Sequence, residues 1–288
     1  MALNRVVLLA ASVAMAAPCA ASRPSRPSRP SSPPKAGRMS LALQFRKIAQ
    51  ARLVFACRTT KPPKIDGVLD DRIWQRVPVS GVLADTVTGA PGAVKTTFKV
   101  CHDWDNLYVA FQCQDHDVWS PFTKRDQPLW EADVVEVFIC PNKDRTHYYE
   151  FEVSPRNVVW DGYITNPKGK QEGIAPDSSW NCAGLRTAVR VRGTLNKRSD
   201  RDAGWTAEMA IPVRCIVGRR AAPGEYWRVN FYRIETKSKK NIELLAWSPT
   251  RQPYFHVPAR FGRLVFWANE APGLPPGRGA HSSKEASK

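Results

Sequence analysis

The stretch DVVEVFICPNKDRTHYYEFEV, residues 133–153, carries the pattern that decides the fold. In its first seven residues, strict alternation places Val135 and Val137 on one face of an extended strand and Glu136 on the other. Its last seven residues, HYYEFEV, repeat the alternation after a polar, turn-forming segment. The stretch therefore predicts two neighbouring β-strands, with carboxylates and aromatic rings sharing one face.

Similar short alternating runs recur along the chain, separated by turn signals such as the DWDN at residues 103–106. The runs that we predict as strands are residues 52–58, 95–101, 106–113, 133–139, 147–153, 158–164, 186–193, 205–211, 226–235, 243–247 and 262–266. Residues 69–75 suit one helical turn, and no long helical pattern stands out. About eleven strands predict an all-β, antiparallel β-sandwich of the jelly-roll or immunoglobulin-like kind, with few or no helices in the core.

The ends of the chain differ in composition from its middle. An apolar run after Arg5 predicts a secretory signal, although the acid-free, basic stretch before Asp66 also suits an organelle transit peptide. The division that we predict is a signal at 1–21, a Pro/Ser/Arg-rich linker at 22–51, one domain at 52–267 and a disordered tail at 268–288. We therefore expect a secreted or periplasmic protein, with an organelle as the alternative.

The net charge of +17 comes from 43 basic and 26 acidic residues, and 12 of the basic ones precede Asp66. The excess of positive charge therefore lies largely in the N-terminal segment before Asp66 and not in the predicted domain. We predict no nucleic-acid partner. No 18-residue apolar stretch follows the N-terminal segment, so we expect no membrane span, and we expect a monomer.

Seven cysteines show no CxxC spacing, which argues against zinc. After Cys19 is removed with the signal, six remain, enough for three disulfides in 15 connectivities. We expect most of them to be buried as small hydrophobic residues.

Few motifs point to a reaction. The chain lacks a Gly-x-Ser-x-Gly elbow, which excludes a serine hydrolase of that class. Glycosidases need two carboxylates, and Glu136, Glu150 and Glu152 have the right chemistry for that role. A hydrolase of polysaccharide or polyester that uses such a pair is therefore one alternative function.

Met209 lies in an alternating run and is interpreted as a core residue rather than a haem ligand.

Seven motifs in order resemble one known family over residues 57–266. They are IDGVLDDRIW (65–74), HDWDNLYVAFQCQD (102–115), TKRDQPLWEADVVEVFICP (123–141), YYEFEVSP (148–155), GWTAEMAIP (204–212), YWRVNFYRIE (226–235) and WSPTRQPYFHVPARFGRLVF (247–266). The series resembles carbohydrate-binding module family 9, and most closely an uncharacterised branch of it. The resemblance implies a β-sandwich related to the sugar- and haem-binding DOMON group.

That resemblance implies a non-catalytic module that binds the end of a sugar chain between two aromatic rings. By position in the motifs, the rings fall on Trp130 and Phe255, the ligand carboxylate on Glu136 and a loop amide on Gln252. Glu152 stands where the family has a sugar-binding Arg, so a donor has become an acceptor. The DOMON relation also implies a second alternative, a haem-binding redox domain.

The resemblance implies no cofactor, with structural calcium as an option. The oxygen-rich turns at 103–106 and 115–117 have suitable ligand types for that ion. We interpret both as ordinary surface turns.

Overall fold

The structure is a computed structural model that describes residues 52–142, 144–238 and 241–271. Its strands are β1 (Leu53–Arg58), β2 (Ala84–Asp85), β3 (Thr96–His102), β4 (Asn106–Cys113), β5 (Val134–Cys140), β6 (His147–Val153), β7 (Val159–Thr165), β8 (Ala175–Asp177), β9 (Arg186–Arg192), β10 (Gly204–Pro212), β11 (Tyr226–Ser238), β12 (Asn241–Ala246) and β13 (Gly262–Glu270). Two short helices, α2 (Arg72–Arg76) and α3 (Val213–Val217), and 3-10 turns at Leu129–Glu131 and Pro258–Arg260 complete it. Among these residues, no helix is long and apolar enough to cross a membrane.

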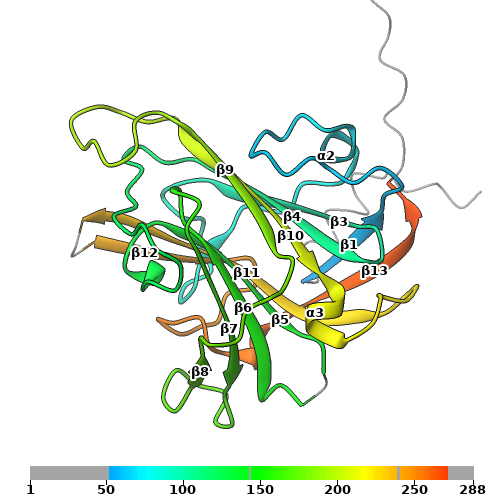
Figure 1. The fold of residues 1–288 in the computed structure, drawn as a ribbon. Coiled ribbons are helices and arrows are strands. Elements are labelled where there is room, and N and C mark those ends of the chain that lie inside the picture. Colours follow the sequence, from blue (N-terminus) through cyan, green and yellow to red (C-terminus); the bar gives the residue numbers. More distant parts are fainter. Residues whose placement is uncertain (1–51, 143, 239–240, 272–288) are drawn as a thin grey trace, which may run out of the picture. The chain divides into compact units, whose positions relative to one another are not determined.

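The strands follow one hydrogen-bonded path in the order β8-β7-β6-β5-β11-β13-β1-β3-β4-β10-β9, and β12 pairs with β11 and β2 (Figure 1). The path turns back on itself, so that β5, β6 and β11 face β3, β4 and β10 across a shared apolar core. The pairs are antiparallel within the described chain, except where β1 lies parallel to β13 and to β3. This is the predicted all-β sandwich.

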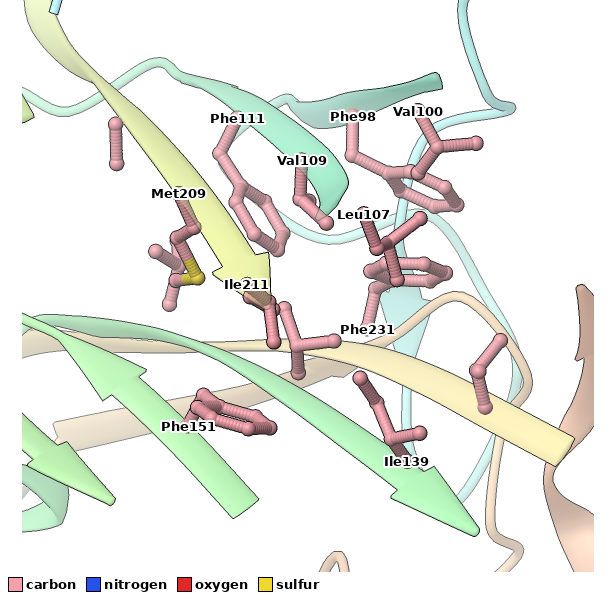
Figure 2. Packing of buried hydrophobic residues seen from close by; sticks show 14 of the residues in the cluster. Phe98, Val100, Leu107, Val109, Phe111, Ile139, Phe151, Met209, Ile211 and Phe231 are labelled. Atoms are coloured by element: carbon pink, nitrogen blue, oxygen red, sulfur yellow. The ribbon is translucent and has the colours of Figure 1, made fainter. Parts of the chain in front are cut away.

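The core between the layers is built from the inward residues of the alternating runs. Phe98 of β3 stacks on Phe231 of β11 with ring centroids 3.8 Å apart, and both rings are fully buried. Figure 2 shows Ile139 and Phe151 from one layer pointing toward Met209 and Ile211 from the other. Burial of so many large side chains supplies the main driving force for this fold. Met209 is a core residue, as its alternation predicts.

The predicted strands are all present, with ends that differ by a few residues. The short strands β2 and β8 and the helix α3 were missed, because two- to five-residue elements carry too little periodicity to be recognised. The six described cysteines are free thiols, and all but Cys215 are buried.

The opposite face of β5 is also covered, and this face positions the site. Val134 and Phe138 pack there against Leu129, Phe255 and Phe261, which two loops bring across the sheet. Every residue of β5 is therefore buried, although only one face contacts the sandwich core.

Candidate functional site

A cavity of about 480 Å³ lies on this loop-covered face, over β5, β6, β7, β11 and β12. We call it the glutamate pocket. Its aromatic lining is Trp130, Trp160, Tyr254 and Phe255, its aliphatic lining includes Ile164, Ile174, Ile234 and Leu244, and its acidic lining is Glu136, Glu150 and Glu152. An apolar wall with a few convergent polar groups is the usual form of a small-ligand site.

Strand register brings the three glutamates together. Glu136 of β5 lies directly opposite Glu152 of β6, and Glu150 lies two residues before Glu152 on the same face. One carboxylate oxygen from each residue falls within 4.8 Å of the others. Like charges directly opposite in a sheet are destabilising, so this arrangement opposes folding unless the carboxyls are neutral or matched by a cation.

The three carboxyls are buried: Glu136 is 2% exposed, Glu150 is 5% exposed and Glu152 is 0% exposed. Burial raises the pKa of all three above the ordinary range, and Glu150 reaches about 8. The neighbouring carboxyls raise the pKa of Glu136 and Glu152 further. Among the described residues, the one group that can donate to the oxygens of Glu152 is Glu150 in its protonated form.

None of the described residues that line the pocket is Lys or Arg, and the one histidine among them is neutral. Burial lowers the pKa of His256 to about 4, and its Nδ1 lies 2.7 Å from the Tyr148 hydroxyl. Asn166 Nδ2 donates to that hydroxyl and to the His256 carbonyl, both at 3.2 Å. The pocket is therefore a concentration of acidic groups without a compensating protein cation.

The aromatic rings of the pocket differ in accessibility. Trp130, in the 3-10 turn before β5, is 46% exposed and meets Trp160 edge-to-face at 6.0 Å. Phe255 is buried and stacks on Tyr232 at 4.1 Å. Trp130 is therefore the ring best placed to meet a ligand from solvent, while Phe255 belongs mainly to the wall.

Of the residues predicted to bind sugar, Trp130, Glu136, Glu152 and Phe255 line this one cavity. Gln252 is exposed and is not among the lining residues, because the short turn around Thr250 holds its backbone at the surface.

Sequence reasoning missed other residues of the pocket, namely Trp160, Gln171, Tyr254 and His256. Trp160 lies directly opposite Glu152 in the β6–β7 pair, but alternation within a single strand does not give this register. The others come from loops that carry no period.

A second buried acidic group, Asp115, Asp133 and Glu235, lies outside the pocket. Here the protein supplies its own cation: Arg233, fully buried, donates to Asp115 at 2.7 Å and to Glu235. Asp133 accepts the backbone N–H groups of Trp119 and Thr236, both at 2.7 Å. This cluster is a structural ion-pair network.

The turns considered for calcium have their carboxylates engaged by the protein. Asp103 accepts the Asn106 N–H and the Tyr108 hydroxyl, at 2.7 and 2.6 Å. Asp115 holds Arg233, and Asp117 pairs with Arg198. Each of these carboxylates therefore has a protein partner in the structure.

Comparison with known proteins shows which family this chain resembles in sequence. The family model for carbohydrate family 9 binding domain-like proteins matches residues 65–268. The chain is 26% identical over 178 residues to an extracellular protein of Arthroderma benhamiae, covering 60% of this chain and 78% of that protein. It is 27% identical over 207 residues to endo-1,4-beta-xylanase A of Thermotoga neapolitana, covering 70% of this chain but only 17% of the xylanase.

Solved structures agree on the fold. Two structures of a family 9 carbohydrate-binding module from Caldicellulosiruptor kristjanssonii, in complex with cellotriose and with glucose, each superpose with a TM-score of 0.53 at 17% identity. They cover 78% and 77% of this chain and 98% and 100% of the module. At this identity the likeness concerns the fold. Because the family model spans well over half of the sequence, the chain belongs to the carbohydrate family 9 binding domain-like family.

Proposed function

We propose that this protein binds the end of a carbohydrate chain in the glutamate pocket and catalyses no reaction there. The observation that carries the proposal is the position of an exposed indole, Trp130, at a cavity with three carboxyls in its wall. Sugar rings present apolar C–H faces that stack on flat aromatic rings, while their hydroxyls need fixed donors and acceptors. The family 9 modules solved with cellotriose and glucose support a β-1,4-linked glucan end as the first ligand to test.

The raised pKa values of the glutamates bear on how a neutral sugar would be held. A protonated carboxyl donates one hydrogen bond and accepts others, whereas a carboxylate only accepts. Burial keeps the pKa of Glu152 well above its usual range, so this residue can donate where the family resemblance implies an Arg. The exchange of Arg for Glu therefore preserves a donor, provided that the carboxyl is protonated.

The geometry favours binding over hydrolysis. A glycosidase places its two carboxyls on either side of the scissile bond, and keeps one of them ionised. Here the three come from two adjacent strands, within 4.8 Å of one another, and no protein cation in the pocket holds one ionised. As for the haem alternative, Met209 is fully buried in the sandwich core and cannot reach a bound haem.

We also propose that the protein acts outside the cell. The support is the similarity to an extracellular protein, together with the apolar segment after Arg5. The predicted signal at residues 1–21, the linker at 22–51 and nearly all of the C-terminal tail lie outside the described residues. Expression of the intact gene with N-terminal sequencing of the mature protein tests this directly.

Trp130→Ala should weaken binding of cellotriose by about tenfold or more, because loss of one stacking platform costs roughly 1.5 kcal/mol. Isothermal titration calorimetry of the full-length protein measures the effect. Trp267→Ala is the matched control, since Trp267 is similarly exposed but lies on β13, where it contacts Phe55. Equal affinities for the two variants would contradict the proposed site, and release of reducing sugar from the ligand would contradict the proposed lack of catalysis.

A further inference from the structure

The glutamate pocket gathers three buried carboxyl groups, which become a concentration of negative charge whenever they ionise. Its described lining includes three acidic groups, no Lys or Arg, and a histidine that burial keeps neutral. The other titratable groups that face the cluster are the Tyr148, Tyr232 and Tyr254 hydroxyls. None of these described groups supplies positive charge, so among the described residues an ionised glutamate would be compensated only by a proton or by a ligand.

Glu152 is the clearest sign that a ligand completes this site. Its side chain is fully buried, it lines the cavity, and its oxygens receive no hydrogen bond from any described group other than a protonated Glu150. Glu150 likewise leaves one buried oxygen, Oε2, without a partner. Buried carboxyl oxygens without donors are costly, and natural proteins retain them mainly where a ligand, ion or water satisfies them.

We propose that the pocket selects an aminated sugar, a glucosamine unit at the end of a β-1,4-linked chain, and that its ammonium group is held by Glu136, Glu150 and Glu152. The inference rests on the proposed carbohydrate function and names its ligand class. A primary ammonium carries three N–H donors, which matches three carboxyls grouped within 4.8 Å.

The remaining lining favours this organic cation over a metal ion. A hard divalent cation takes six to eight oxygens or keeps several waters, whereas the wall around the glutamates consists largely of Trp160, Ile164, Ile234 and Leu244. Aromatic faces attract an ammonium through cation–π interaction and also stack on the sugar ring to which it is attached. Trp130 and Trp160 provide such faces at the cavity.

The test compares three trisaccharides that differ only at carbon 2: cellotriose, the glucosamine trisaccharide and its N-acetylated form. Titration of the full-length protein at pH 7.5 should show the glucosamine trisaccharide bound at least tenfold more tightly than the other two. Salt at 0.15 M limits long-range repulsion from the protein's positive charge, because the Debye length is then about 8 Å.

The dependence of affinity on pH distinguishes binding of an ammonium group from binding of a neutral sugar. An ammonium requires an ionised carboxylate, and Glu150, with a pKa near 8, ionises only as the pH rises toward that value. Affinity for the glucosamine trisaccharide should therefore increase from pH 5.5 toward the pKa of the ligand's own ammonium group, by up to tenfold for each unit and with release of a proton on binding, and should level off above that pKa. Affinity for cellotriose, which uses protonated carboxyls, should stay level or fall.

Glu150→Gln and Glu152→Gln should each weaken binding of the glucosamine trisaccharide more than binding of cellotriose, so that the preference for the aminated ligand is lost. Glu131→Gln, next to Trp130 but exposed, loses the same charge and should leave the preference intact. Equal or weaker binding of the glucosamine trisaccharide in the unaltered protein overturns this inference and leaves the proposed function standing. Stoichiometric binding of Ca²⁺ alone that requires Glu152 also overturns it, whereas failure of all three sugars to bind overturns the proposed function as well.

Discussion

Arg233→Met should lower the free energy of unfolding by about 3–5 kcal/mol. Arg233 is fully buried and is the cation for Asp115 and Glu235, and its guanidinium also lies 5.2 Å from the Trp205 ring. Methionine fills most of the same volume but leaves those carboxyls in the interior without their partner, and breaking a buried ion pair from one side costs this much. Urea unfolding followed by tryptophan fluorescence measures the loss.

A matched surface pair gives the control for this experiment. Arg219 pairs with Glu225 at 2.8 Å, but its side chain is well exposed. Arg219→Met should therefore cost much less stability than Arg233→Met, because an exposed ion pair contributes little to folding. A loss at Arg233 no larger than the loss at Arg219 would show that the Asp115 network does not depend on its arginine.

Glu150→Gln should stabilise the protein increasingly as the pH rises from 5 to 8. Burial raises the pKa of Glu150 from 4.5 to about 8, so the folded state holds a proton that the unfolded state releases. Below about pH 4.5, Glu150 is protonated in both the folded and the unfolded state and does not affect stability. Between pH 4.5 and 8, only the unfolded state releases this proton, so the free energy of unfolding falls as the pH rises. One pH unit corresponds to about 1.4 kcal/mol, so the loss at pH 8 is on the order of 4 kcal/mol.

The informative quantity is the difference between the two proteins at each pH, because groups outside the glutamate pocket titrate equally in both. Unfolding free energies of the unaltered protein and of Glu150→Gln should agree near pH 5 and diverge toward pH 8, with the variant more stable. Glu131→Gln, which removes an exposed carboxyl, should follow the unaltered protein throughout. Parallel curves for Glu150→Gln would mean that Glu150 titrates normally in the folded state.

The fold could be predicted largely from the sequence, because a period of two is a local property. The alternation in residues 133–139 correctly assigned Val135 and Val137 to the sandwich core and Glu136 to the opposite face. The same reasoning placed Glu150 and Glu152 on one face of their strand. Elements too short to show a period, such as α3, were not found.

What the tertiary structure alone decided is how those faces meet. Alternation says that Glu136 and Glu152 each share a face with aromatic residues, but only the β5–β6 register sets them directly opposite one another. Only the loops that carry Trp130 and Phe255 across the sheet turn an open face into a cavity.

Burial then converts three ordinary glutamates into groups with raised pKa values and no protein cation in their pocket. The sequence by itself therefore determined the strands and the residue types available for binding. Their chemistry was decided by long-range packing, because the cost of ionising a carboxyl depends on how much water and which charges surround it, and neither is a local property of the chain.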